Sequence, residues 1–141
     1  MQIQRYVNKI SGPLLDRIDI HIEVPAVKFK ELETADVDSS NCIRSRVIAA
    51  RNRQIERFSS NSIFANAQMN SQLIAKHCKI SNNAKTILEH ALNRLGLSAR
   101  AYDRILKVSR TIADIEGASN IDTHHIAEAI QYRSLDRNYW K

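Results

Sequence analysis

The sequence predicts a mainly α-helical fold, a small helical bundle over residues 39–133 that follows a short segment with one strand. Apolar residues recur at helical spacing through most of the chain after residue 39. Only three Gly and two Pro occur in 141 residues, too few for an all-β fold built on many tight turns. Apolar residues at 43% and charged residues at 26% are typical of one globular domain and not of a disordered chain.

The charge balance favours an anionic partner. Lys and Arg number 21 against 15 Asp and Glu, a net charge of +6, which suits nucleic acid, nucleotide phosphates or acidic protein surfaces. No apolar run approaches the roughly 20 residues of a membrane helix, and no signal peptide opens the chain. Cys42 and Cys78 are isolated, so neither a disulfide framework nor a zinc site is indicated. We expect no membrane partner, no bound metal and a cytoplasmic location.

Residues 1–27 differ in kind from the rest of the chain. Residues 2–9 have a helical pattern, which Gly12-Pro13 ends. Residues 18–24 alternate apolar and polar side chains with period two, the pattern of a half-buried strand, and Pro25 ends it. Because no second strand follows nearby, we expect the sheet that contains this strand to lie outside the sequence.

Residues 28–38 read as an acidic linker, after which the helical part begins. Ser39 or Ser40 caps a helix that runs to about Phe58. Five arginines share one side of this helix, and we interpret them as a solvated face that is compatible with nearby DNA. Residues 59–70 are expected to be loop and residues 71–78 a short helix. The predicted apolar face of the first helix consists of Ile43, Val47, Ile48, Ile55 and Phe58; the arginines are Arg44, Arg46, Arg51, Arg53 and Arg57.

Three further helices complete the predicted bundle. Residues 81–95 have apolar side chains at three- and four-residue spacing, and Gly96 stands where a C-terminal cap belongs. Ser98 caps a helix to about residue 116, ended by Gly117, whose apolar positions cover more than half its circumference. It is therefore expected to be the central helix. Asp122 or Thr123 caps a last helix that carries Ile126, Ala127 and Ile130.

Motifs of self-sufficient catalysis are missing from the sequence. It has no GxxxxGK[ST], GxSxG, HExxH or DxDxDG pattern. His124 and His125 are adjacent, and neighbouring helical residues point about 100° apart, so an exposed helix start is the favoured interpretation over a metal site. The chain by itself is not expected to be an enzyme.

Arg17 is one candidate for a phosphate-binding role. It lies between the Gly12-Pro13 turn and the predicted strand, a corner from which an arginine can reach a phosphate on a neighbouring subunit. The alternative is that Arg17 pairs with Asp16, Asp19 or Glu23, and the pattern alone favours this alternative.

Arg100 is the second candidate, two residues after the Ser98 cap in the first turn of the central helix. A helix start has free amide donors and a partial positive charge, which favour an anion there. Arg104 and Lys107 continue the same face. The alternative is a solvated basic face that is partly neutralised by two pairs at i, i+4 spacing, Asp103 with Lys107 and Arg110 with Asp114.

The surrounding residues resemble a known family. Residues 4–6 and 10–25, with the run Leu14-Leu15-Asp16-Arg17, resemble the end of the AAA+ core in magnesium-chelatase-like ATPases, in the ComM-type competence protein branch. Residues 66–69, 95–114 and 126–137 resemble the C-terminal helical domain of that family. The resemblance covers nearly the whole chain, and residues 28–65 are its least distinctive part.

The resemblance implies roles that the residues alone do not show. Members are ring-forming, Mg-dependent ATPases whose nucleotide lies between a P-loop domain, a helical lid and the adjacent subunit. Arg17 matches the arginine finger, which acts in trans, and Arg100 matches the sensor-2 arginine, which reaches the γ-phosphate in cis. Arg104 and Lys107, on the same face as Arg100, are weaker candidates for binding the nucleotide. ATP and Mg²⁺ are then the cofactors of the intact protein, with none bound by this chain alone because the P-loop lies upstream of Met1.

The resemblance implies three parts: residues 1–27 end the AAA+ core, residues 28–38 form the linker, and residues 39–141 form the helical lid. The expected function is a nucleotide-sensing lid in a ring-forming, hexameric assembly that moves branched DNA with ATP. One alternative is a subunit of a true magnesium chelatase that acts in metal insertion. The other is a free-standing helical nucleic-acid-binding module, which would leave the unpartnered strand unexplained.

Overall fold

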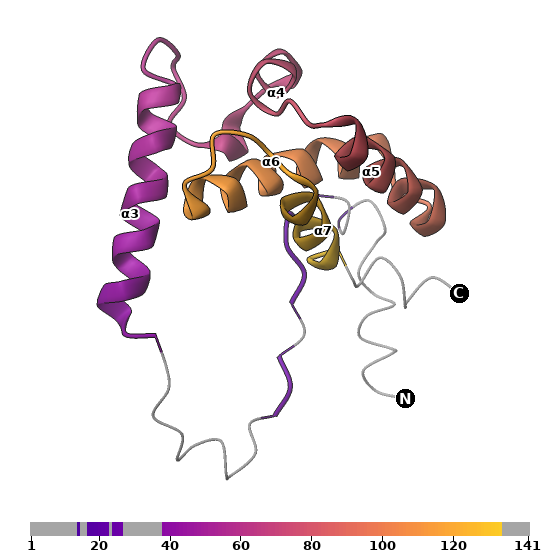
Figure 1. Ribbon diagram of the computed structural model, residues 1–141, viewed down its shortest axis with the longest axis horizontal. Coiled ribbons are helices and arrows are strands. Elements are labelled where there is room, and N and C mark those ends of the chain that lie inside the picture. Colours follow the sequence, from indigo (N-terminus) through magenta and orange to yellow (C-terminus); the bar gives the residue numbers. More distant parts are fainter. Residues whose placement is uncertain (1–13, 15–16, 23, 27–37, 134–141) are drawn as a thin grey trace.

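The computed structural model describes residues 14, 17–22, 24–26 and 38–133 (Figure 1). Within these residues the secondary structure is helical, as predicted. The elements are α3 (Ser40–Arg57), the 3₁₀ turn η2 (Asn66–Gln68), α4 (Ser71–His77), α5 (Asn82–Leu95), α6 (Ala99–Glu116) and α7 (Thr123–Gln131).

Polar side chains cap the N-termini of four of the described helices, and at Ser39 and Ser98 they do so as the sequence predicts. The hydroxyl of Ser39 accepts a hydrogen bond from the N–H of Cys42 at 3.3 Å, and Asn70, Ser81 and Ser98 cap α4, α5 and α6 in the same way. Gly96 and Gly117 end α5 and α6 with φ of 61° and 86°. This left-handed backbone carries a steric penalty for any residue with a Cβ, so glycine fits both ends.

Helix α6 is the central helix, which confirms the prediction. It packs against α7, α3, α4 and η2, while α5 packs against α7 (Figure 1). Ile80 and Ile121 form an isolated parallel bridge that joins the segments leading into α5 and α7. The core between these elements includes Phe58, Met69, Ile74, Leu88, Ile105, Leu106, Ile121 and Ile126.

The apolar face predicted for α3 is largely exposed, a correction to the sequence analysis. Ile43, Val47, Ile48 and Ile55 are each 45–53% exposed, and the buried positions of α3 are Ala50 and Gln54. In Figure 1 the N-terminal half of α3 extends away from the other helices. Only the C-terminal part of the helix reaches α6, so Ile43, Val47 and Ile48 in its N-terminal half have no surface to pack against among the described residues.

The strand predicted over residues 18–24 is also not formed among the described residues of that range. Residues 18–22 and 24–26 have no strand pairing, and Ile20, Ile22 and Val24 are exposed. A strand needs a neighbouring strand to satisfy its backbone groups, and none is present in the described part of the chain. The predicted helix over residues 2–9, most of the linker and residues 134–141 lie outside the described residues. Across the described helices, none combines the length and apolar character needed to cross a membrane.

Candidate functional site

Arg100 lies where the sequence predicts it, in the first turn of α6. The hydroxyl of Ser98 accepts a hydrogen bond from the N–H of Ala101 at 3.2 Å and so sets the start of the helix. The Arg100 side chain is exposed and makes no hydrogen bond or ion pair with a described residue. Its guanidinium is therefore available to an anionic group near the positive end of α6.

Arg104 and Lys107 lie further along α6 but are bound within the chain. Arg104 forms an ion pair with Asp19, and Nζ of Lys107 donates to the carbonyl oxygen of Ala67 at 2.9 Å. The expected ion pair between Asp103 and Lys107 is not formed, and the ammonium group of Lys107 binds the carbonyl oxygen at η2 instead. Lys107 and Asp19 both line a mainly apolar cavity of about 280 Å³ between α6, α7 and residues 19–20.

Arg17 is exposed at a turn, in which its backbone N–H donates to the carbonyl oxygen of Leu14 at 2.9 Å. The structure shows no ion pair between Arg17 and Asp19, whose carboxylate binds Arg104 instead. The other two carboxylates weighed as partners, at positions 16 and 23, lie outside the described residues. Of the three carboxylates considered as partners of Arg17, that of Asp19 is therefore excluded.

The residues that follow Arg17 are held against the helical bundle. The N–H of His21 donates to the carbonyl oxygen of Tyr132 at 2.7 Å, and Nη1 of Arg133 donates to the carbonyl oxygen of Ile18 at 2.6 Å. Arg133 is only 1% exposed. With the Asp19–Arg104 ion pair, these contacts attach the segment after Arg17 to both α6 and the C-terminal end of α7. Sequence reasoning missed this attachment.

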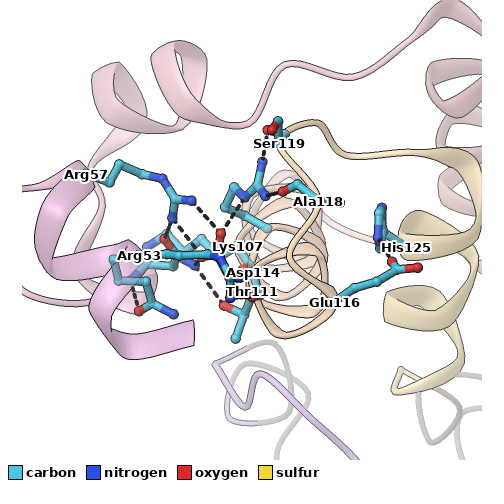
Figure 2. Close-up of polar contacts among 12 residues, drawn as sticks. Arg53, Arg57, Lys107, Thr111, Asp114, Glu116, Ala118, Ser119 and His125 are labelled. Carbon is cyan, nitrogen blue, oxygen red and sulfur yellow. Dashed lines mark hydrogen bonds and ion pairs between the residues drawn. The ribbon is translucent and has the colours of Figure 1, made fainter. Parts of the chain in front are cut away.

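A buried polar network surrounds Asp114 of α6 (Figure 2). Both carboxylate oxygens bind Arg57 of α3, one of them from Nη1 at 2.7 Å. Nε of Arg110 and Nδ2 of Asn66 donate to the same carboxylate at 3.2 Å and 2.8 Å. Asp114 is fully buried, so its charge is stable there only because these donors replace water.

Further contacts extend this network to the end of α6. Arg53 donates to the carbonyl oxygen of Asp114 at 2.8 Å, and Arg110 donates to the carbonyl oxygens of Ala118 and Ser119 at 2.6 Å and 2.9 Å (Figure 2). Burial lowers the pKa of Arg110, and Asp114 opposes that shift. The network therefore joins α3, η2, α6 and the following loop.

The network corrects two expectations about charge. The Arg110–Asp114 pair is confirmed, but it is buried and not part of a solvated face. Arg53 and Arg57 are likewise not simply solvated, since both reach Asp114. The position of Asp114 within the otherwise apolar stretch 112–115 was a possible sign in the sequence that its carboxylate is buried. Its partners were not identifiable from spacing, because Arg57 and Asn66 lie 57 and 48 residues away.

His125 is buried, which corrects the prediction of an exposed histidine pair at the start of α7. Its Nδ1 accepts a hydrogen bond from the N–H of Asp122 at 2.8 Å, and its Nε2 binds Oε2 of Glu116. His124 is exposed as predicted, and its Nε2 lies 2.9 Å from the same oxygen. The pair thus joins the start of α7 to the end of α6.

Glu116, His124 and His125 bring three potential metal-ligand atoms within 4.8 Å of one another. The hydrogen bonds of His125 nevertheless oppose a cation there. Because Nδ1 accepts the Asp122 N–H, a neutral ring carries its proton on Nε2, where it donates to Glu116. A metal-binding histidine normally presents a bare nitrogen to the metal and donates its other N–H to an acceptor. The arrangement fits a set of hydrogen bonds from His124 and His125 to Glu116 that joins α7 to α6, which we call the Glu116 clasp.

Comparisons with known proteins support the family resemblance over nearly the whole chain. The family described as magnesium chelatase, subunit ChlI C-terminal, matches residues 37–133, and the family described as magnesium chelatase, subunit ChlI, matches residues 1–32. The chain is 47% identical to competence protein ComM of Haemophilus influenzae over 138 residues. It is 43% and 41% identical to the uncharacterised YifB proteins of Escherichia coli and Salmonella typhimurium. In each case the match covers 96% of this chain and 26% of the relative, so the chain spans about a quarter of these relatives' length.

Proposed function

Because this chain belongs to the magnesium chelatase ChlI C-terminal family, we propose that it forms the nucleotide-sensing lid of a ring-forming AAA+ ATPase. The observation that carries this proposal is the exposed Arg100 in the first turn of α6. Its position on the helix matches the sensor-2 arginine of the resemblance. In this role its guanidinium binds a phosphate of ATP from the lid side.

The contacts of the neighbouring cations support a special role for Arg100. Asp19 neutralises Arg104, and the carbonyl oxygen of Ala67 binds Lys107. Of the three cations predicted on this face of α6, Arg100 alone keeps all its donors free of contacts with described residues. A planar guanidinium can bind two phosphate oxygens at once, which suits a residue that distinguishes ATP from its hydrolysis products.

The attachment of the segment after Arg17 supports a second part of the proposal. Arg17 acts in trans, on the nucleotide held by the adjacent subunit of the ring. Because Ile18 and His21 are hydrogen-bonded to the end of α7, and Asp19 to α6, a movement of the lid changes the position of Arg17. Nucleotide sensing at Arg100 and the action of Arg17 are thereby coupled within one subunit.

ATP and Mg²⁺ supply the phosphoanhydride and its charge-neutralising ion when bound to the whole protein. Arg100 fits a phosphate of that nucleotide, since it is exposed and unpaired among the described residues. The sequence has no phosphate loop of its own. We therefore assign binding and orientation to this chain, and assign hydrolysis to the whole protein.

For the whole protein we propose a DNA branch-migration motor of the ComM type. The 47% identity to a protein named competence protein ComM and the net charge of +6 support this proposal. A magnesium chelatase subunit is the second candidate, because the matching family models carry that description.

One experiment tests both parts of the proposal. ATP turnover of the full-length protein is measured with and without forked DNA at fixed low salt. Stimulation by the fork supports the DNA motor, and turnover that is indifferent to DNA favours the chelatase-like candidate. In the same assay, Arg100→Ala is expected to lower turnover by on the order of a hundredfold with the ring assembled. Arg94→Ala, an exposed arginine on α5, is the matched control, and wild-type turnover of Arg100→Ala would exclude the sensor role.

A further inference from the structure

Arg57 and Arg110 of the Asp114 network also belong to a second basic site, to which no function has been assigned above. A cavity of about 210 Å³ opens between the C-terminal ends of α3 and α4 and the loop that follows α6. Its lining includes Arg57, Lys76, His77, Lys79, Arg110 and Asn120. No carboxylate from the described residues lines it.

The local charge is strongly positive. Four permanently cationic side chains line the cavity, and the one carboxylate bound to them is that of Asp114, which Arg57 and Arg110 share. Lys76 and Lys79 are exposed and form no ion pair with a described residue. Like charges held this close together are stable only with a compensating anion or with extensive hydration.

The two arginines are held in place before any ligand arrives. Arg110 is 3% exposed, and Asp114, Ala118 and Ser119 accept three of its five N–H bonds. Arg57 uses three of its five donors on Asp114 and Asn66. Each guanidinium therefore keeps two N–H groups that no described residue accepts. Donors fixed in this way lose little conformational freedom when they bind a further group.

His77 also lines the cavity, and the same cations act on its side chain. Burial lowers the pKa of His77, and the charges of Lys76, Arg57 and Arg110 lower it further. Three cations from three different elements thus act on one imidazole. The neutral ring adds no positive charge, and it packs edge-on against Phe58 with ring centroids 5.6 Å apart.

This cavity is distinct from the proposed nucleotide contact. Arg100 and Arg110 are both on α6, and ten residues of helix correspond to about 15 Å. An anion at Arg110 therefore does not share its contacts with Arg100.

We propose that the cavity lined by Arg57, Lys76, Lys79 and Arg110 binds a phosphate group. The group comes either from the phosphodiester backbone of nucleic acid or from free phosphate. In both cases the fixed arginines bind its oxygens, and the two lysines neutralise its charge from the solvent side.

The test compares two double variants of the full-length protein that each remove two positive charges. Lys76→Ala/Lys79→Ala changes the cavity, and Lys85→Ala/Arg94→Ala changes exposed cations of α5. Binding of a fluorescently labelled single-stranded oligonucleotide is measured by anisotropy at several salt concentrations. Binding of inorganic phosphate is measured by calorimetry with a non-hydrolysable ATP analogue in excess, so that the nucleotide site is occupied.

If the phosphate belongs to nucleic acid, the cavity variant loses about tenfold or more in oligonucleotide affinity, and the slope of log affinity against log salt falls by about one. If it is free phosphate, the cavity variant loses the calorimetric signal and keeps the oligonucleotide affinity. The control variant stays within about twofold of wild type in either case. Wild-type binding of both ligands by the cavity variant, or equal losses in the two double variants, would overturn the proposal. Because Lys76 and Lys79 form no hydrogen bond or ion pair with a described residue, melting followed by circular dichroism is expected to show an unchanged fold.

Discussion

Arg57 and Asp114, which lie 57 residues apart, bind each other through two guanidinium nitrogens and two carboxylate oxygens. The Arg57 side chain is 16% exposed and that of Asp114 is fully buried. This contact is where α3 meets the central helix α6 (Figure 2). It replaces the apolar packing predicted for α3, most of whose apolar residues face solvent.

Removal of the buried carboxylate is expected to be strongly destabilising. Asp114→Ala leaves Arg57 and Arg110 without their shared counter-charge, which costs about 3–5 kcal/mol in the free energy of unfolding. Arg46→Ala breaks the exposed pair with Asp38 and is expected to cost at most about 1 kcal/mol. Urea unfolding of the 141-residue chain, followed by circular dichroism, measures both. Similar values for the two variants would contradict a structural role for the network.

The two helix-ending glycines provide a second comparison. An alanine at either position must adopt positive φ, which costs about 1–2 kcal/mol. At Gly117 the new Cβ would also lie 3.1 Å from Nη2 of Arg53, whereas at Gly96 no atom lies within 4 Å. Gly117→Ala is therefore expected to lower the melting temperature more than Gly96→Ala. The order would be reversed or absent if Arg53 did not contact the end of α6.

The Glu116 clasp is expected to make stability depend on pH. Hydrogen bonds from His124 and His125 lower the pKa of Glu116, and the hydrogen bond to Glu116 raises the pKa of His124. The raised histidine pKa stabilises the fold below the ordinary value of 6.5, and this contribution is lost as pH rises through the folded pKa. The lowered carboxyl pKa stabilises it above 4.5, and that contribution is lost as pH falls.

The stabilising contribution of the clasp is therefore largest between pH 4.5 and 6.5. Melting temperatures of wild type and Glu116→Gln are compared from pH 4 to pH 9. We expect the difference between them to peak in that window and to shrink toward pH 9. Glu89→Gln, which changes an exposed carboxylate on α5, serves as the control. A difference that grows toward alkaline pH would be inconsistent with this arrangement.

The Asp19–Arg104 ion pair leads to a prediction about ATP hydrolysis. If Arg104 acts by holding the segment after Arg17, then Asp19→Ala and Arg104→Ala reduce turnover of the full-length protein by similar factors. The double variant is then no slower than either single variant, because both remove one interaction. If Arg104 instead binds the nucleotide directly, Arg104→Ala is the slower variant and Asp19→Ala stays near wild type. Steady-state turnover of the four proteins distinguishes the two roles.

Local sequence was sufficient for the helices. Ser39, Ser81 and Ser98 begin α3, α5 and α6, and Gly96 and Gly117 end α5 and α6, each at the predicted position. These features depend on backbone groups within one turn of the residue concerned, so spacing along the chain identifies them. The position of Arg100 in the first turn of α6 was predictable for the same reason.

The sequence by itself thus determined the helices, their caps, the central place of α6 and the family. Tertiary structure alone decided which charges are free and which are buried. Asp114 meets Arg57 and Asn66, Asp19 meets Arg104, and Glu116 meets His125, all across different elements. Helical periodicity shows which residues share a face, but a charged face becomes buried or solvated only according to what packs against it. That packing depends on contacts between distant segments, which no local pattern encodes.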